Sequence, residues 1–296
     1  MGLDNINDYY EPHRKLSNVR EIEALQSTGQ FAFVTGDIRQ VDTVSTLFSE
    51  NEFEVVIHLA AMAGVRASIE DPALYYSVNV DGTRVLLDAA ARFGQNAQAP
   101  MFVLASTSSV YGKTDRIPFE EDDCCDRPLV PYSASKRSAE MMAFSYHNMF
   151  ELDINILRFF TVYGPRGRPD MMAYKIADSI RSGDEVPLYN GGQMYRDWTY
   201  VDDTVSGIVA AADHRLGYEI FNLGRGESTL LSDFIKLVEE RFGRHAKLRP
   251  STMPLGDVHS AVANIDKARK ILGYNPQVGV SDGVEAFADW YESIHS

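Results

Sequence analysis

Tyr132 and Lys136 form a Tyr-x-x-x-Lys unit whose phenol and ammonium groups are suited to proton transfer. On a helix, residues four positions apart share a face, so both side chains would point into one cleft. A free tyrosine, with a pKa of about 10, is a poor base at neutral pH, but a neighbouring cation favours its phenolate. The unit is weak evidence by itself, because roughly one chance match is expected in a chain this rich in tyrosine.

A cluster of hydroxyl side chains at residues 106–109 lies ahead of this unit, and Thr107 precedes Tyr132 by 25 residues. The apolar residues 101–105 predict a strand that ends at this cluster, and Pro131 predicts the first turn of the helix that carries Tyr132. A hydroxyl at the strand end would then hold the substrate oxygen that gives up its proton.

Apolar, β-rich runs alternate with helical patterns through the first half of the chain. Strands are expected at 31–34, 55–59, 101–105 and 154–157, and helices at 40–50, 72–94 and from 131 onward. This order predicts an α/β fold with a doubly wound parallel sheet, which binds ligands beyond the carboxyl ends of its strands. Because residues 55–59 are nearly all apolar, we expect that strand to be buried on both faces.

The alternation loosens after Thr161. A loop at 163–169 precedes helices near 171–181, 202–213 and 231–242, a strand at 219–222 and a final helix at 282–294, in which Val284, Phe287 and Trp290-Tyr291 should dock on the body. We therefore expect a sheet domain over residues 1–160 and a smaller lobe over 161–296, with some segments returning to the first domain.

Charge and composition limit the possible partners. The 296 residues hold 28 Lys and Arg against 42 Asp and Glu, a net charge of −14, which argues against nucleic acid and anionic membranes as partners. Apolar runs are short and the N-terminus is polar, so neither a membrane span nor a signal peptide is expected. The adjacent Cys124 and Cys125 cannot join distant segments, which fits a reducing cytoplasm, and no metal site is expected around them.

Recognisable motifs lie at residues 3–10, 58–66, 79–83, 106–112, 131–136, 160–171, 196–203 and 256–258. Together they resemble the extended short-chain dehydrogenases/reductases, in particular the nucleotide-sugar 4-epimerases of the UDP-glucuronate 4-epimerase type. The resemblance implies a Rossmann-like domain that binds NAD, a nucleotide-sugar substrate, most simply a UDP-uronate, and a homodimer paired through the tyrosine-bearing helix. On that helix Ala139, Met142, Ala143 and Tyr146 would permit such pairing.

The resemblance fails at the N-terminus. Members of the family open with a strand, a Gly-x-x-Gly-x-x-Gly turn and a helix, whose N–H groups hold the cofactor pyrophosphate. This sequence has none of them before Leu3-Asp4-Asn5. A wrong gene start or incomplete sequence explains this, and so does a chain that begins here; in the second case the sheet lacks its first strand and NAD binding should be weak.

The remaining site residues follow from the resemblance. Thr107, Tyr132 and Lys136 would be catalytic. Asp4 would accept hydrogen bonds from the adenosine ribose, unless it is simply an exposed acid; Asp37 would bind adenine, cap a helix, or do both; and Asn79 would brace cofactor-lining loops, unless it is solvated. The implied cofactor contacts are Asp4, Asn5, Asp37, Ile38, Leu59, Ala60, Ala61, Ala63, Asn79, Ser106, Tyr132, Lys136 and Phe159, and the substrate contacts are Arg66, Ser108, Thr161, Arg168, Arg196 and Asp257.

Three functions stay open. The related dehydratases and decarboxylases resemble Thr-Asp-Glu and Thr-Ser-Glu at the hydroxyl cluster, whereas Thr107 is followed here by Ser108-Ser109, without a carboxylate. Because epimerisation needs one base and a hydride carrier, 4-epimerisation of UDP-glucuronate is favoured. The alternatives are another dehydratase or reductase reaction of the superfamily, and a truncated pseudoenzyme that binds nucleotide sugars without turnover.

Overall fold

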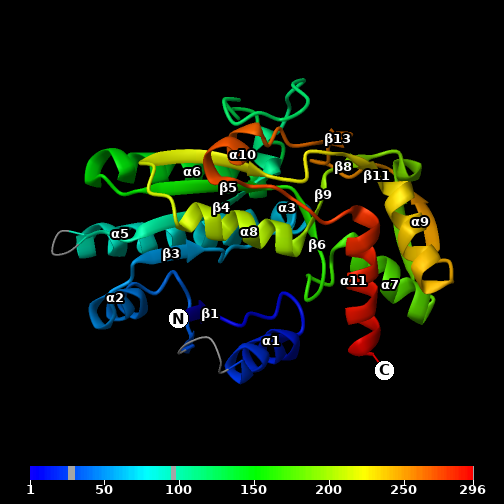
Figure 1. Cartoon of the computed structure of the whole chain (residues 1–296), viewed down its shortest axis with the longest axis horizontal. Helices are drawn as coiled ribbons and strands as arrows, with labels where there is room; N and C mark the ends of the chain where they lie inside the picture. Colours follow the sequence, from blue (N-terminus) through cyan, green and yellow to red (C-terminus); the bar gives the residue numbers. More distant parts are fainter. Residues whose placement is uncertain (26–30, 95–97, 296) are drawn as a thin grey trace.

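The main sheet of the protein has four parallel strands in the order β10-β5-β4-β3 (Figure 1). The structure, a computed structural model, describes residues 1–25, 31–94 and 98–295. The strands are β3 (Val55–His58), β4 (Met101–Thr107), β5 (Ile154–Phe159) and β10 (Tyr218–Leu223), and every neighbouring pair is parallel. The predicted α/β fold with a parallel sheet is therefore confirmed.

A separate sheet of two strands carries the N-terminus. Strand β1 (Gly2–Asp4) pairs in parallel with β2 (Phe33–Thr35), and no ladder joins the described strands of this sheet to those of the main sheet. Strands β1 and β2 therefore form a sheet of their own. Helix α1 (Pro12–Ala24), which the sequence analysis did not predict, follows β1 and begins with a proline in its first turn.

Strand β3 departs from the prediction of burial on both faces. Val55, Ile57 and the following Leu59 are 36%, 45% and 53% exposed, whereas His58 is 3% exposed. Successive side chains of a strand point to opposite faces, so one face of β3 is buried and the other is open. The prediction was wrong because β3 lies at the edge of the four-stranded sheet instead of in its interior.

The two faces of the main sheet carry different helices. Phe102 and Leu104 belong to a core cluster with α2 (Val41–Glu50), α5 (Thr83–Gly94) and α6 (Pro131–Phe150), while Met101 and Val103 belong to one with α8 (Val201–Ala212) and α10 (Asp266–Leu272). The predicted long helix consists of α4 (Pro72–Tyr76), the π-helical η1 (Ser77–Gly82) and α5; its Asp71 cap accepts a hydrogen bond from the N–H of Leu74.

A third core cluster packs around aromatic side chains from α7 (Met172–Ser182), α9 (Leu231–Phe242) and α11 (Val280–Ser293), which lie together in Figure 1. Trp198 stacks on Phe234 with ring centroids 3.7 Å apart. Val284, Phe287 and Tyr291 are buried in this cluster, so the predicted docking of the last helix is confirmed. None of the described helices combines the length and apolar character needed to cross a bilayer.

Short elements complete the described part of the fold. They are α3 (Ala67–Glu70), η2 (Ser108–Tyr111), β6 (Thr161–Tyr163), β7 (Glu185–Tyr189), η3 (Asn190–Gly192), β8 (Tyr195–Arg196), β9 (Trp198–Tyr200), β11 (Thr229–Leu230), β12 (Lys247–Ser251) and β13 (Ser260–Ala261). Strands β6 and β9 pair, as do β7 and β12, and β8 lies between β11 and β13.

Candidate active site

The predicted catalytic residues come from the carboxyl end of β4 and the first two turns of α6. Thr107 is the last residue of β4, and its Oγ1 accepts a hydrogen bond of 3.1 Å from the N–H of Ser109. Tyr132 is the second residue of α6, and Lys136 lies one turn further along, 3% exposed. The structure therefore brings phenol, hydroxyl and ammonium to one end of the sheet.

The electrostatics of Tyr132 differ from the expectation. Burial raises the pKa of the phenol above its usual value of 10.0, and a hydrogen bond with Thr107 and the charge of Arg168 lower it in part. The cation that acts on the phenol in this structure is thus Arg168, and the predicted lowering by Lys136 is not seen. Burial lowers the pKa of Lys136 itself to about 8, against the opposing effect of Glu140.

Asn79 ties the loop after β3 to the helix that carries Tyr132. Its Oδ1 accepts a bond of 2.8 Å from the N–H of Met62, and its Nδ2 donates to the Met62 carbonyl at 2.9 Å. The same Nδ2 donates to Ser135 Oγ at 3.0 Å, between Tyr132 and Lys136 in sequence. Asn79 is 0% exposed, so the alternative of a solvated asparagine was wrong.

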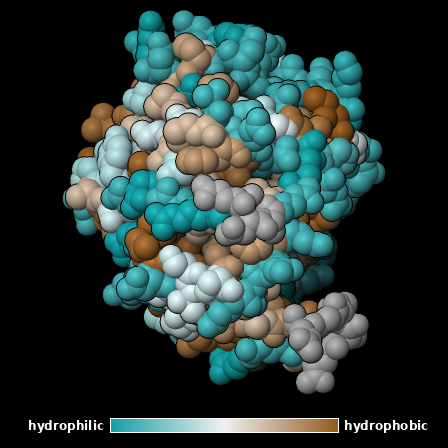
Figure 2. Space-filling view, turned by 90° about the vertical axis from the view of Figure 1, so that its left-hand side faces the viewer, coloured by the Kyte–Doolittle hydropathy of each residue, from teal (hydrophilic) through white to brown (hydrophobic). Residues whose placement is uncertain are grey.

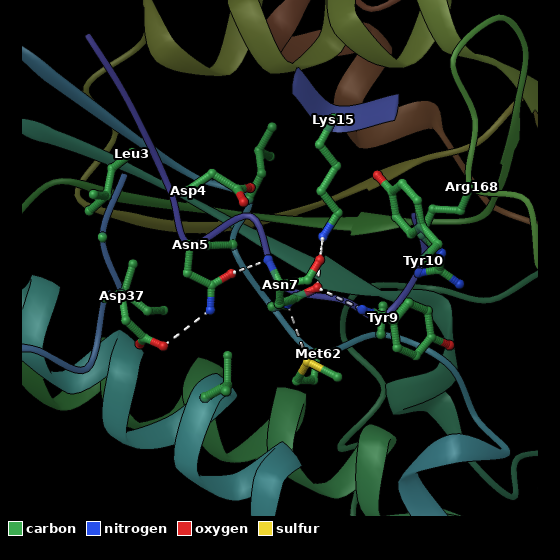
Figure 3. Close-up of a pocket in the computed structure, with 17 residues that line it drawn as sticks. Leu3, Asp4, Asn5, Asn7, Tyr9, Tyr10, Lys15, Asp37, Met62 and Arg168 are labelled. Atoms are coloured by element: carbon green, nitrogen blue, oxygen red, sulfur yellow. Dashed lines mark hydrogen bonds between the residues drawn. The ribbon is translucent and has the colours of Figure 1, made fainter. Parts of the chain in front are cut away.

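A cavity between β1, the loop after β2 and the loop after β3 gathers most of the predicted cofactor contacts (Figure 3). Asp4 is exposed but lies in its wall, and Asp4 Oδ1 accepts a bond of 2.7 Å from the N–H of Ile6. The loop after β3 carries small side chains, so its backbone lies close to the cavity. The predicted residues that line this cofactor cavity are Asp4, Asn5, Asp37, Ile38, Leu59, Ala60, Ala61 and Ala63.

Asp37 is held by two partners at this cavity. Arg39 donates to its two oxygens at 2.9 and 2.7 Å, and Asn5 Nδ2 donates to Oδ2 at 3.1 Å. These bonds, led by that of Arg39, hold the pKa of the carboxyl well below its usual value. The N-cap position of α2 is Gln40, so the alternative in which Asp37 caps that helix was wrong.

A second cavity, here the nucleotide cavity, brings together three predicted substrate contacts: Ser108, Arg196 and Asp257. Arg196 Nη1 donates to the Tyr195 carbonyl at 2.8 Å. Burial lowers the pKa of Arg196, and the carboxylate of Asp257 opposes this effect. A partly buried arginine of this kind is suited to a phosphate, which it can bind through two parallel hydrogen bonds.

Arg168 connects the cofactor cavity with Tyr132. It lines that cavity, and its charge acts on the Tyr132 phenol. Its Nε and Nη2 each donate to Asp170 at 2.9 Å, and its guanidinium lies 5.9 Å from the ring centroid of Tyr9. Arg168 therefore holds a positive charge next to the hydroxyl that would face the substrate.

Four predicted contacts lie elsewhere. The guanidinium of Arg66 lies 4.2 Å from the ring centroid of Tyr189, and the hydroxyl of Ser106 donates to Glu140, away from both cavities. Phe159 ends β5 and Thr161 begins β6, and neither lines the two cavities described above. Ser106, Phe159 and Thr161 do lie at or beside strand ends, but the sequence did not show where their side chains point.

Sequence analysis missed Lys15, which lines the cofactor cavity from α1. Lys15 Nζ donates to the carbonyl and the side-chain oxygen of Asn7 at 2.8 and 2.7 Å. Asn7 lies in a stretch that the sequence had singled out, but α1 itself was not predicted, so nothing marked the lysine.

The residues present fit NAD at its two ends. Asp4, Asn5 and Asp37 offer acceptors for an adenosine, and Tyr132 with the buried Lys136 offers a phenol and an ammonium for the nicotinamide ribose. Between these ends, Lys15 and Arg168 are the cations that line the described part of the cavity.

The chain is similar to known proteins over nearly its whole length. The family model described as GDP-mannose 4,6 dehydratase matches residues 6–287. A UDP-glucuronate 4-epimerase of Thermodesulfobacterium geofontis is 38% identical over 291 residues, covering 98% of this chain and 87% of that protein. The crystal structure of UDP-glucuronic acid 4-epimerase from Bacillus cereus, in complex with UDP-glucuronic acid and NAD, is similar with a TM-score of 0.89 at 33% identity, covering 99% of this chain and 90% of that one.

Proposed function

Because the chain belongs to the GDP-mannose 4,6-dehydratase family within the extended short-chain dehydrogenases/reductases, we propose that it is an NAD-dependent UDP-sugar 4-epimerase that interconverts UDP-glucuronate and UDP-galacturonate. The observation that carries the proposal is the meeting of Thr107, Tyr132 and Lys136 at the carboxyl end of β4, with the charge of Arg168 acting on the phenol.

The chemistry assigns one role to each catalytic side chain. Tyr132, as phenolate, takes the proton of the sugar 4-hydroxyl and later returns it, while Thr107 holds the 4-oxygen by a hydrogen bond. NAD, when bound, supplies a hydride acceptor that also gives the hydride back to the other face of the 4-keto sugar. Lys136 would bind the nicotinamide ribose and offset the phenolate charge. Burial alone raises the pKa of Tyr132, so phenolate formation depends on the charges present in the loaded site.

The substrate would span the two cavities. Arg196 and Asp257 would hold the nucleotide in the nucleotide cavity, with Ser108 beside them. Arg168 would meet the uronate carboxylate, because it combines a positive charge with proximity to Tyr132. Arg66, stacked on Tyr189, has less support as a sugar contact.

Dehydration is the second candidate, and the family model bears that name. Elimination of water needs an additional acid and base, and the residues that follow Thr107 are Ser108 and Ser109. A non-catalytic nucleotide-sugar binder is the third candidate. Incubation of the protein with NAD and UDP-glucuronate, followed by NMR of the sugar products, separates the three: UDP-galacturonate supports the proposal, a dehydrated product supports the second candidate, and binding without conversion supports the third.

We also infer a homodimer in the cytoplasm, although the helix face predicted for pairing must be corrected. Ala139 and Ala143 are 0% exposed within the chain's own core, and Tyr146 is also buried, so these residues cannot form an interface. Met141 and Phe144 of α6 are each 53% exposed and would pack against a second copy. Apolar patches also interrupt the hydrophilic surface on the left-hand side of the molecule (Figure 2).

Cys124 and Cys125 are free thiols, as a reducing compartment allows.

A further inference from the structure

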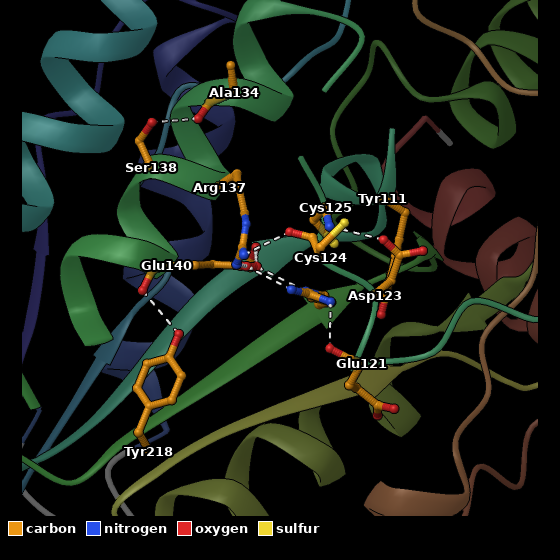
Figure 4. Close-up of polar contacts among 12 residues, drawn as sticks. Tyr111, Glu121, Asp123, Cys124, Cys125, Ala134, Arg137, Ser138, Glu140 and Tyr218 are labelled. Atoms are coloured by element: carbon orange, nitrogen blue, oxygen red, sulfur yellow. Dashed lines mark hydrogen bonds and ion pairs between the residues drawn. The ribbon is translucent and has the colours of Figure 1, made fainter. Parts of the chain in front are cut away.

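A fully buried ion pair joins Glu140, which Figure 4 labels, to Arg158. Glu140 of α6 and Arg158 of β5 are both 0% exposed. Arg158 donates through Nε and Nη2 to the two carboxylate oxygens of Glu140 at 3.1 and 2.9 Å, and Arg137 donates to one of them at 2.9 Å. The carboxylate is therefore fixed by two guanidinium groups.

Stability does not account for such a pair. Removing two charges from water costs several kcal/mol for each ion, and apolar side chains of similar volume are often as stabilising or more so. A role beyond stability therefore has to be sought in what else the carboxylate contacts.

Two further interactions of the Glu140 carboxylate lead to the catalytic residues. Ser106, the neighbour of Thr107 on β4, donates its hydroxyl to Glu140 Oε1 at 2.5 Å. Tyr132, Lys136 and Glu140 follow one another at intervals of four residues on α6, so they lie along one face of the helix. The Glu140 carboxylate raises the pKa of the Lys136 ammonium and so opposes the lowering of that pKa by burial.

We propose that Glu140 is a positioning residue for the epimerase reaction: its carboxylate, fixed by Arg158 and Arg137, anchors Ser106 next to Thr107 and supplies the negative charge that faces Lys136. This role rests on the proposed function of the site. It differs from a purely structural role, in which Glu140 would serve only to neutralise Arg158.

The surroundings make the effect measurable by titration. Burial raises the pKa of Cys125, beside Arg158, to about 11, and raises that of Tyr218, whose hydroxyl donates to the Glu140 carbonyl. On the other side of Lys136, burial lowers the pKa of His58 to about 3. Lys136, with a pKa of about 8, is thus the member of this set that changes charge between neutral and mildly alkaline pH.

The decisive variant replaces both members of the pair, Glu140→Met with Arg158→Met, because removing Glu140 alone would leave the Arg158 guanidinium buried without its partner. Lysine side chains are labelled with ¹³C, Lys136 is assigned by comparison with Lys136→Met, and its titration is followed by NMR together with the alkaline limb of kcat/KM. We expect the double variant to fold, and Lys136 to lose its proton about one pH unit lower. The alkaline limb of the kcat/KM profile should also move to lower pH. The single variant Glu140→Asp, which keeps the carboxylate and Arg158, should show the Lys136 titration and the pH profile of the unmodified protein.

An unchanged Lys136 titration and pH profile in the folded double variant would overturn the proposal and leave a structural ion pair. If the double variant does not fold, the same titration in Glu140→Gln decides. Absence of epimerase activity in the unmodified protein would refute the proposed function instead, while the lysine titration, which needs neither substrate nor cofactor, still tests the electrostatic role of Glu140.

Discussion

Replacement of Arg168 by alanine should weaken the binding of UDP-glucuronate much more than the binding of UDP-glucose. The two ligands differ at the sugar carboxylate, and Arg168 is the cation whose charge acts on Tyr132. The variant removes the guanidinium from the wall of the cofactor cavity and leaves the catalytic side chains in place.

The expected size of the loss follows from how Arg168 is already engaged. A hydrogen bond to a charged group contributes about 1.5–3 kcal/mol, which corresponds to about 10- to 140-fold in affinity. The Nε and Nη2 groups are bonded to Asp170 at 2.9 Å each, so the substrate would meet chiefly the N–H groups on Nη1. Because Arg168 shares its charge with Asp170, we expect a selective loss of affinity at the lower end of this range, about tenfold.

Isothermal titration of both ligands into the NAD-loaded protein measures the selective loss, and kcat/KM for UDP-glucuronate provides a second measure. Arg166→Ala is a matched control two residues away, because Arg166 is about half exposed and pairs with Glu21. Equal losses for the two ligands, or the same selective loss in the control, would refute the assignment of Arg168 to the uronate.

Three further predictions concern other parts of the molecule. Tyr132→Phe should lower kcat by about 10²–10⁴-fold at unchanged thermal stability, since it removes a general base; a loss below about tenfold would exclude that role. Burial lowers the pKa of His58 from 6.5 to about 3, so the unfolded chain binds a proton that the folded chain does not bind, and the free energy of unfolding should fall as the pH drops from about 6.5 toward 3. Chemical denaturation of His58→Gln should show a weaker pH dependence of this free energy, and an equal pH dependence would contradict the reasoning. Joining a strand–Gly-x-x-Gly-x-x-Gly–helix unit ahead of Gly2 should tighten NAD binding at least about tenfold. It should also raise Tm, because the open edges of β1 and β3 gain a partner. Equal NAD affinities of the two proteins by titration calorimetry would show that another element, such as Lys15, already supplies the phosphate contacts.

Local patterns were sufficient to predict the elements that hold the catalytic residues. The apolar run before Thr107 became β4, and Pro131 opens α6 as its fixed φ angle favours. The interval of four residues between Tyr132 and Lys136 fixed their common face once the helix formed. These predictions succeeded because they depend on neighbours within one or two turns of the chain.

Long-range contacts decided what the sequence could not. Ile57 is as apolar as a buried strand residue, yet it is 45% exposed, because burial depends on which strand lies beside β3 and not on its own composition. Ser106 and Thr107 are adjacent hydroxyls, and only packing against α6 directs the first to Glu140 and leaves the second next to Tyr132.

The sequence by itself determined the fold class, the strand and the helix that carry the catalytic residues, and the end of the sheet at which these residues meet, since hydrophobic periodicity and the carboxyl-end rule are properties of the chain alone. Only the tertiary structure decided the charge environment. The pKa of Tyr132 is raised instead of lowered, because desolvation outweighs the lowering effects of Thr107 and Arg168, which lie tens of residues away in the sequence. Such distances are set when the core closes, and no local pattern in the sequence records them.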